Sequence, residues 1–171
     1  MKKALLLILA ILSCLTLCAC GKEEPIDAED NYTPELIFEV SSDLNSYVVK
    51  GLGGIPASKD IIIPATYQGV PVTAIGNSAF PGMQITSVTI PNSVTQIGER
   101  AFYQSTNLNN ITISNSVTEI GGEAFGECTG LTSIIYHGTK VQWTAIDKHD
   151  RWDYGTMGKY TVYCTDGEIS G

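Results

Sequence analysis

The sequence repeats itself with a period of 23 residues. The stretch that begins at residue 90 can be laid on the stretch that begins at residue 113, and nine positions carry matching side chains. In the first copy these are Ile90, Val94, Ile97, Gly98, Ala101, Phe102, Ser105, Leu108 and Ile111, and in the second they are Ile113, Val117, Ile120, Gly121, Ala124, Phe125, Cys128, Leu131 and Ile134. A less regular copy runs from Ile63 to Val88. A fixed period of this length predicts a solenoid of about three coils, because each repeat buries its apolar face only against its neighbours.

Within one coil, apolar residues alternate with polar ones as they do in a half-buried strand. The residues expected to enter the core are Leu108, Ile111 and Ile113, and those expected to stay outside are Asn109, Asn110 and Thr112. A second short strand is expected over 94–97, followed by Gly98, where a β-carbon would hinder the turn of the backbone. Stacking of the coils should then place isoleucine on isoleucine and phenylalanine on phenylalanine.

Two segments carry a resemblance to a known family. They are Ile-Pro-Asn-Ser-Val-Thr-Gln-Ile-Gly-Glu-Arg-Ala-Phe at 90–102 and Ile-Ser-Asn-Ser-Val-Thr-Glu-Ile-Gly-Gly-Glu-Ala-Phe at 113–125. They resemble the BspA-type leucine-rich repeats of bacterial surface proteins, and the resemblance covers roughly residues 60–137. It implies a leucine-rich-repeat-like β-solenoid and a role in cell-surface adhesion or recognition. The chain departs from the family pattern at Ser105, where Cys is common, and at Ser114, where Pro is usual.

The segments on either side of the repeats are expected to cap them. Residues 36–50 alternate apolar and polar side chains around Asp43, as a β-hairpin does. Residues 138–146 predict a short helix, and residues 160–164 predict a last strand. The fold expected for residues 35–171 is therefore mainly β: an N-terminal hairpin cap (35–59), leucine-rich repeats (60–137) and a C-terminal α/β cap (138–171).

The N-terminus has the features of a secretory signal peptide. Lys2 and Lys3 precede an apolar stretch over 4–17, which is too short for a membrane span. Residues 17–21, Leu-Cys-Ala-Cys-Gly, resemble a bacterial lipobox, which implies cleavage after residue 19 and attachment of lipid to Cys20. Residues 20–34 are then an acidic tether, and the mature protein is expected outside the cytoplasm, anchored to the bacterial membrane and exposed at the surface. Ordinary secretion without lipid is the alternative.

The charge of the chain disfavours nucleic acid as a partner. The formal net charge is −8, and loss of residues 1–19 with their two lysines would change it to −10. A polyanion would be repelled.

Motifs that would indicate catalysis or a cofactor are missing from the sequence. The two histidines, His137 and His149, lie near the C-terminus with no nucleophile motif. The spacing of Cys128, His137, His149 and Cys164 does not match zinc sites, and Asp147, Asp150 and Asp153 are interleaved with Lys148 and Arg151 rather than placed in a calcium loop. We therefore expect no enzyme activity and no cofactor. The sequence favours free thiols for Cys128 and Cys164, although a disulfide is compatible with the expected compartment.

The outward side chains of the repeat strands are the candidate ligand contacts. They are Thr86, Ser87, Thr89, Asn109, Asn110, Thr112, Thr132 and Ser133. Such hydroxyl and amide groups could contact a protein or glycan, or they could be ordinary residues of a solvated sheet. Trp143, Trp152 and Tyr154 could stack on a sugar, although packing within the cap is the simpler interpretation. The function expected is a non-catalytic surface module that binds a host, microbial or glycan partner. The alternative is a structural or accessory subunit of a cell-envelope assembly.

Overall fold

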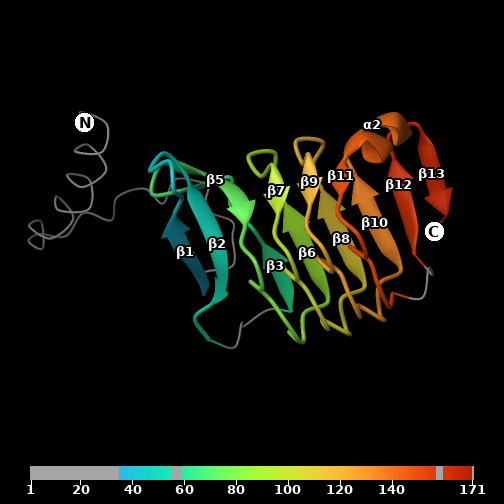
Figure 1. Cartoon of the computed structure of the whole chain (residues 1–171), viewed down its shortest axis with the longest axis horizontal. Coiled ribbons are helices and arrows are strands. Elements are labelled where there is room, and N and C mark those ends of the chain that lie inside the picture. Colours follow the sequence, from blue (N-terminus) through green and yellow to red (C-terminus); the bar gives the residue numbers. More distant parts are fainter. Residues whose placement is uncertain (1–34, 55–58, 157–159, 171) are drawn as a thin grey trace, which may run out of the picture.

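The chain winds into a β-solenoid of about four turns (Figure 1). The structure is a computed structural model that describes residues 35–54, 59–156 and 160–170. The expected signal peptide (1–19), the tether (20–34) and Cys20 lie outside the described residues. No helix among the described residues is long and apolar enough to cross a membrane.

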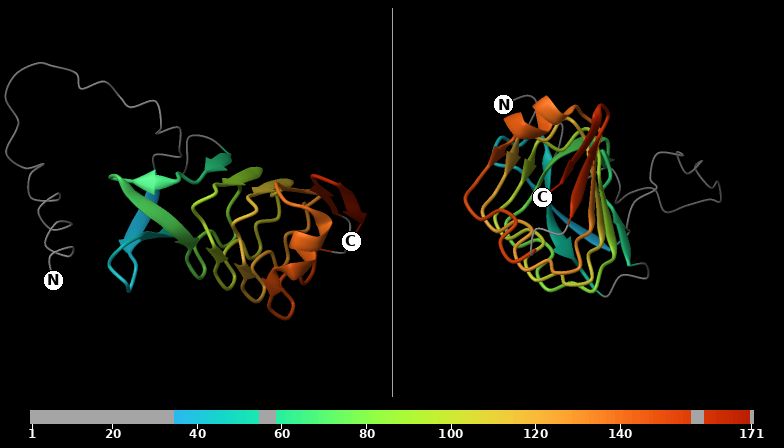
Figure 2. Two further views of the ribbon diagram at one scale, coloured as in Figure 1. Left: turned by 90° about the horizontal axis from the view of Figure 1, so that it is seen from above. Right: turned by 90° about the vertical axis from the view of Figure 1, so that its right-hand side faces the viewer.

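Two sheets form the walls of the solenoid, and the chain passes from one to the other in each coil (Figure 2). The seven-stranded sheet contains β1 (Leu36–Val40), β2 (Tyr47–Leu52), β4 (Thr66–Tyr67), β5 (Val70–Ile75), β7 (Gln96–Ile97), β9 (Glu119–Ile120) and β11 (Asp147–Lys148). The six-stranded sheet contains β3 (Asp60–Ile62), β6 (Ser87–Ile90), β8 (Asn110–Ile113), β10 (Ser133–Tyr136), β12 (Thr161–Cys164) and β13 (Gly167–Ser170). The described residues hold one helix, α2 (Lys140–Ala145).

The strand register confirms the predicted repeat. Ser87 on β6 pairs with Asn110 on β8, and Asn110 pairs with Ser133 on β10, always in parallel. Gln96 on β7 pairs with Glu119 on β9 in the other sheet. Each of these pairs is 23 residues apart in sequence, so one sequence period corresponds to one coil.

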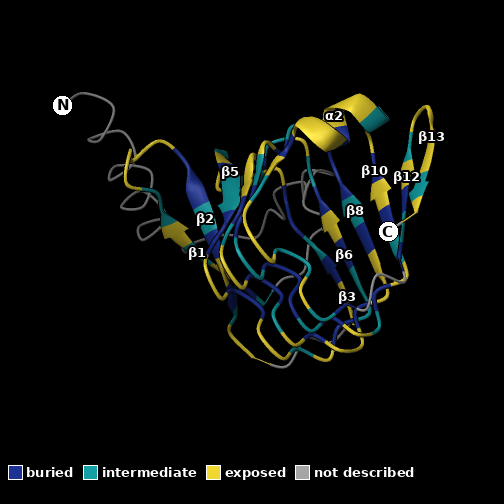
Figure 3. Ribbon diagram, turned by 45° about the vertical axis from the view of Figure 1, so that its right-hand side comes forward, coloured by how far each residue is buried: buried dark blue, intermediate teal, exposed yellow. Residues whose placement is uncertain are grey.

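The inward side chains stack into columns that run through the core. The ribbon in Figure 3 shows buried segments at corresponding places in neighbouring coils. Ile75, Ile97 and Ile120 form one buried column. The rings of Phe80 and Phe102 lie 5.3 Å apart at 9°, and those of Phe102 and Phe125 lie 5.4 Å apart at 5°. The predicted stacking of like residues is confirmed. Leu108, Ile111 and Ile113 are buried as expected, and Asn109 and Asn110 are exposed.

A buried polar column runs beside the phenylalanines. The Ser105 hydroxyl donates to the Phe80 carbonyl oxygen at 2.9 Å, and the Cys128 thiol donates to the Phe102 carbonyl oxygen at 3.0 Å. Cys128 therefore does what Ser105 does one coil earlier. Both Cys128 and Cys164 are free, with Cys128 buried and Cys164 half-buried. Burial raises the pKa of the Cys128 thiol to about 12.

Glycine in each coil is required by the close approach of neighbouring coils. A β-carbon on Gly98 would lie 2.6 Å from the Asn77 nitrogen, and one on Gly121 would lie 2.5 Å from the Glu99 nitrogen. The left-handed backbone of the turn falls two residues later, at Arg100 (φ 54°) and Glu123 (φ 53°). Sequence reasoning identified the glycine correctly but did not locate the turn's left-handed residue.

The predicted N-terminal hairpin is confirmed. Strands β1 and β2 pair antiparallel, with the turn around Asp43, and β2 continues in parallel with β5. Phe38 stacks on Tyr67 with ring centres 4.0 Å apart. The hairpin therefore closes the N-terminal end of the seven-stranded sheet.

The C-terminal segment contains the predicted helix and also completes another coil. Helix α2 begins after Thr139, whose hydroxyl accepts from the Gln142 nitrogen. Beyond it, β11 pairs in parallel with β9, and β12 pairs with β10. This extra coil is the difference between the observed four turns and the expected three. The helix lengthens the coil, so no 23-residue period marks it in the sequence. The final hairpin of β12 and β13 was not predicted either.

Candidate functional site

The outer surface of the six-stranded sheet, named here the hydroxyl face, presents two rows of side chains. Register places each row across neighbouring strands. The first row is Asp60, Ser87, Asn110, Ser133, Thr161 and Ser170. The second row is Ile62, Thr89, Thr112, Ile135, Tyr163 and Glu168.

The structure brings all eight candidate contact residues together on β6, β8 and β10 and at their starts. Ser87, Asn110 and Ser133 lie in the first row, and Thr89 and Thr112 lie in the second. The other three precede the strands and are joined through their backbones. The Asn109 nitrogen donates to the Thr86 oxygen at 2.9 Å, and the Thr132 nitrogen donates to the Asn109 oxygen at 3.0 Å.

The hydroxyl face carries no formal charge between its two ends. Asp60 stands at one end of the first row and Glu168 at the other end of the second. Between them lie only hydroxyl, amide and apolar side chains, although the chain has a net charge of −8. Depletion of charge is a property of the centres of protein interfaces.

Two exposed apolar side chains lie in the second row near the C-terminal end. Ile135 is 41% exposed and Tyr163 is 47% exposed, and they face each other across β10 and β12. Sequence reasoning missed Tyr163. The alternation of residues 160–164, with Val162 buried, would have identified it.

At the N-terminal end, the hydroxyl groups are already engaged. The Ser87 and Thr86 hydroxyls donate to the Asp60 carboxylate at 2.7 and 3.0 Å. These hydrogen bonds lower the pKa of Asp60. The side chains best placed to meet a partner are therefore those further along, on β8, β10 and β12.

The hydroxyl face is small. Six strands about 4.8 Å apart and four residues long cover roughly 24 by 13 Å, or about 300 Å² in projection. A stable protein interface buries about 800 Å² on each partner. The face by itself therefore suits a weak contact or a slender ligand.

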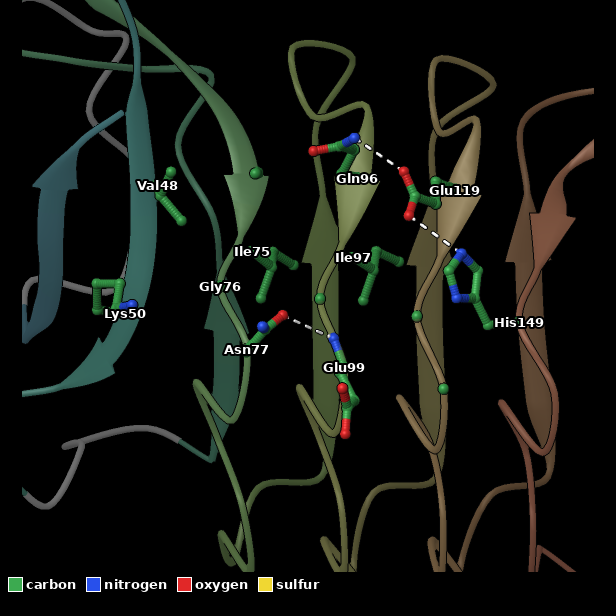
Figure 4. A pocket seen from close by; sticks show the side chains of 14 residues that line it. Val48, Lys50, Ile75, Gly76, Asn77, Gln96, Ile97, Glu99, Glu119 and His149 are labelled. Carbon is green, nitrogen blue, oxygen red and sulfur yellow. Dashed lines mark hydrogen bonds and ion pairs between the residues drawn. The ribbon is translucent and has the colours of Figure 1, made fainter. Parts of the chain in front are cut away.

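A groove, named here the glycine groove, lies along the seven-stranded sheet (Figure 4). Its volume is about 470 Å³, and stacked glycines at 76, 98 and 121 form its floor. The Gln96 amide donates to the Glu119 carboxylate at 2.8 Å, and His149 Nε2 lies 3.2 Å from the same carboxylate. Gln96, Glu119 and His149 are thus linked to one another across the groove.

The groove lacks the hydroxyl and thiol groups that histidine commonly activates. The 14 residues that line it include histidine and carboxylates but no serine, threonine or cysteine. Among the described residues, no group of three or more His, Cys, Asp or Glu side chains could hold a metal ion. Asp153 instead accepts a hydrogen bond from the Tyr160 hydroxyl.

The tryptophans of the C-terminal segment pack within it. Trp143 is buried, and its ring meets those of Tyr136 and Trp152 edge to face. Tyr154 is exposed, but the Arg151 guanidinium lies 4.1 Å from its ring centre. The packing interpretation is therefore confirmed for both tryptophans, and no open aromatic platform is formed from the three residues.

Comparisons with known proteins agree with this architecture. No curated protein matches the chain. A leucine-rich repeat protein from Bacteroides capillosus has a similar structure, with a TM-score of 0.62 and 28% identity over 76% of this chain and 94% of that one. A leucine-rich repeat protein from Bacteroides ovatus has a TM-score of 0.57 and 26% identity over 79% of this chain and 34% of that one.

A leucine-rich cell surface protein from Faecalibacterium prausnitzii is similar too, with a TM-score of 0.50 and 30% identity over 68% of this chain and 34% of that one. The chain thus spans about a third of these last two proteins. Six copies of the BspA type leucine-rich repeat region match residues 58–148, more than half of the sequence. Repeat proteins of this kind are generally protein-interaction modules and typically not enzymes. The chain belongs to the BspA-type leucine-rich-repeat family.

Proposed function

We propose that this protein is a non-catalytic recognition module that is held at the bacterial cell surface by a lipid and contacts its partner through the hydroxyl face. The observation that carries the proposal is the absence of charged side chains from the two rows of the hydroxyl face between Asp60 and Glu168, in a chain of net charge −8. Hydrogen-bonding groups without charge suit a neutral partner, and the acidic surroundings exclude a strongly anionic one.

The size of the face limits the strength of each contact. About 300 Å² of flat sheet supports a glycan chain or a single extended protein segment better than a large globular surface. Many copies on one cell surface would compensate, since linked weak contacts raise avidity by orders of magnitude. Weak individual binding is therefore part of the proposal.

Attachment at the cell surface is supported by the lipobox-like residues around Cys20. It is also supported by the likeness to the Faecalibacterium protein, which is described as a cell surface protein. Several acyl chains on one N-terminus would hold the protein on the membrane almost permanently.

Metabolic labelling with a fatty acid tests the anchor. The wild-type chain should take up label and sediment with membranes, whereas Cys20→Ser should lose both properties. Cys18→Ser is the matched control and should keep them. An unlabelled wild-type chain in the medium would instead support ordinary secretion.

Binding of the full chain, in detergent micelles, to an array of glycans, matrix proteins and envelope extracts of the producing cells tests recognition. A saturable signal should weaken at least about tenfold when Asn109, Asn110 and Thr112 are all changed to Ala, because the centre of the face is lost. The control replaces Thr95, Gln96 and Thr118 with Ala on the opposite sheet. Equal loss in both triple variants would contradict the role of the hydroxyl face.

Binding only to extracts from the producing cells would favour the other candidate function, a subunit of a cell-envelope assembly. Crosslinking in intact membranes would then recover one envelope protein in a fixed ratio to this chain. The adhesion role would be excluded by that result.

A further inference from the structure

A small apolar platform lies near the C-terminal end of the hydroxyl face. Tyr163 on β12 and Ile135 on β10 pair across the sheet and are 47% and 41% exposed. Of the exposed large apolar side chains among the described residues, only these two belong to the six-stranded sheet. An exposed phenol ring beside an aliphatic side chain on a regular sheet suits the flat apolar face of a ligand.

Polar groups surround this platform and are not used inside the protein. Glu168 on β13 flanks Tyr163 on the side away from β10, and its carboxylate makes no ion pair or hydrogen bond to another described residue. The same is true of the hydroxyls of Ser133 and Thr161, which lie beside the platform in the first row. At the N-terminal end of the face, in contrast, Asp60 already accepts from the nearest hydroxyls. Free hydrogen-bonding groups and apolar surface therefore occur together only at the C-terminal end of the described face.

This combination matches the chemistry of a neutral sugar. A pyranose ring has an apolar face of C–H groups and a rim of hydroxyl groups. The face can lie on the Tyr163 ring while rim hydroxyls donate to the Glu168 carboxylate and exchange hydrogen bonds with the first row. An ionised carboxylate only accepts, so it favours a ligand that supplies donors and repels an anionic sugar.

The spacing of the strands favours a glycan chain over a peptide. Neighbouring strands lie about 4.8 Å apart, so each row presents one side chain about every 4.8 Å across the sheet. A β-1,4-linked pyranose unit is nearly as long as this spacing, so successive sugars can lie on successive strands. An extended peptide advances about 3.3 Å per residue and alternates its sides, so its equivalent side chains recur about every 6.6 Å and fall out of step with the rows.

We propose that the hydroxyl face binds a neutral, linear polysaccharide of β-1,4-linked pyranoses that runs across β12, β10 and β8, with one sugar stacked on Tyr163. Figure 1 shows these three strands side by side. The next sugars along the chain lie over Ile135 and Thr112 in the second row, and the first row supplies hydroxyl and amide partners at their rims. Because the glycan occupies the same face, this assignment rests on the proposed function.

A single contact of this kind is weak. One stacked ring and a few hydrogen bonds that replace hydrogen bonds to water correspond to a dissociation constant of the order of 1 mM for a short oligosaccharide. A long polysaccharide can engage many copies of the chain on one cell surface, which raises the avidity.

Titration of the full chain, in deuterated detergent micelles, with cellotetraose, β-1,4-mannotetraose and β-1,4-xylotetraose tests the proposal. Saturation-transfer NMR should give a saturable signal with at least one of them, strongest on the C–H protons of the stacked face. Tyr163→Ala should weaken that binding at least about tenfold, whereas Tyr163→Phe keeps the ring and should stay within about twofold of the wild type. Glu168→Gln removes the charge from the acceptor and should weaken binding about threefold.

Tyr154→Ala is the matched control. Tyr154 is 48% exposed, nearly the same as Tyr163, but the Arg151 guanidinium lies over its ring. Its replacement should leave binding unchanged, and equal losses in the two alanine variants would overturn the proposed site. Maltotetraose has the same sugar as cellotetraose in a bent α-1,4-linked chain and should bind at least about fivefold more weakly, because its units do not follow the straight rows. Equal binding of the two would overturn the proposed chain geometry.

A blocked tetralysine peptide is the competing ligand, since its amines could reach Glu168. Binding of the peptide without binding of any sugar would overturn the glycan and leave the proposed recognition function in place. Absence of binding by all three β-1,4-linked tetrasaccharides up to about 10 mM, roughly ten times the expected dissociation constant, would also overturn the glycan. The recognition function is decided separately, by the loss of array binding in the triple variant of Asn109, Asn110 and Thr112.

Discussion

The two middle coils (residues 90–112 and 113–135) and the last coil (residues 136–164) share one set of columns but fill them differently. Lys148 pairs with Ile120 and so continues the isoleucine column. His149 donates its backbone nitrogen to the Ile120 oxygen, as Gly121 does to the Ile97 oxygen. At these two positions the isoleucine and the glycine of the middle coils are replaced by Lys148 and His149 in the last coil.

The difference arises because a middle coil has a neighbouring coil on both sides, whereas the last coil has a neighbouring coil on one side. Lys148 keeps its amine hydrogen-bonded to the carbonyl oxygens of Trp143 and Ile146, and it lies 4.8 Å from the centre of the Trp143 ring. Partial burial lowers its pKa. A polar residue of this size fits because no further coil must stack on it. The columns are therefore strict only where two neighbours meet.

The largest single effect is expected at the aromatic residues. Phe102→Ala should lower the free energy of unfolding by about 4 kcal/mol, because its ring is buried between two others. Trp152→Ala should lower it by about 2 kcal/mol, because that side chain is only partly buried. Urea unfolding followed by circular dichroism measures both. Equal losses of unfolding free energy would mean that the stability of the last coil depends on its aromatic packing as strongly as that of the middle coils does.

The glycine column gives the next largest effect. Gly121→Ala should cost about 3 kcal/mol, because the new β-carbon meets backbone at 2.5 Å. His149→Ala, in the same column of the last coil, should cost less than about 1 kcal/mol, since only a half-exposed contact with the Glu119 carboxylate is lost. The same unfolding measurement applies. A mild effect at Gly121 would show that neighbouring coils can move apart.

The two free cysteines allow the chemical reactivity of the two regions to be compared. Cys128 in a middle coil should react with iodoacetamide at pH 8 roughly 100-fold more slowly than Cys164, a difference of about 2.7 kcal/mol, because only the thiolate reacts. Burial raises the pKa of Cys128 to about 12. Burial and the nearby Asp166 carboxylate raise the pKa of Cys164 as well, but this thiol is only half-buried and more accessible to the reagent. Peptide mapping by mass spectrometry gives both rates in one sample. Similar rates would indicate that the middle coils open readily.

The raised pKa of Cys128 also has a consequence for stability. The unfolded thiol ionises near pH 9 and the folded one near pH 12, so this group's contribution is fully present below about pH 9 and is lost as the pH rises towards 12. Cys128→Ser should remove that part of the alkaline destabilisation. If the free energy of unfolding of the variant falls at alkaline pH as much as that of the wild type, groups other than Cys128 cause the loss of stability.

The smallest effect is expected in the buried polar column. Ser105→Ala should cost about 1.5 kcal/mol, because the buried Phe80 carbonyl loses its donor. Cys128→Ser should change the free energy of unfolding by less than about 1 kcal/mol, because a hydroxyl can donate to the Phe102 carbonyl in place of the thiol. A large loss of unfolding free energy in Cys128→Ser would show that the packing of this coil requires the larger sulfur atom.

The sequence by itself determined the coil length, the inward and outward residues and the grouping of the eight candidate contacts. All three follow from the 23-residue period, because strands that pair in register bring equivalent residues of successive repeats side by side. It also located the hairpin and the short helix, whose alternation and capping are local. Only the tertiary structure decided that residues 146–164 complete a further coil, since β10 and β12 pair across 28 residues with α2 inserted. It also decided the left-handed backbone at Arg100 and Glu123, the contacts of Glu119 with Gln96 and His149, and the final hairpin of β12 and β13. These features depend on which coils become neighbours in space. The type of a residue does not show whether its coil has a neighbouring coil on one side or on both.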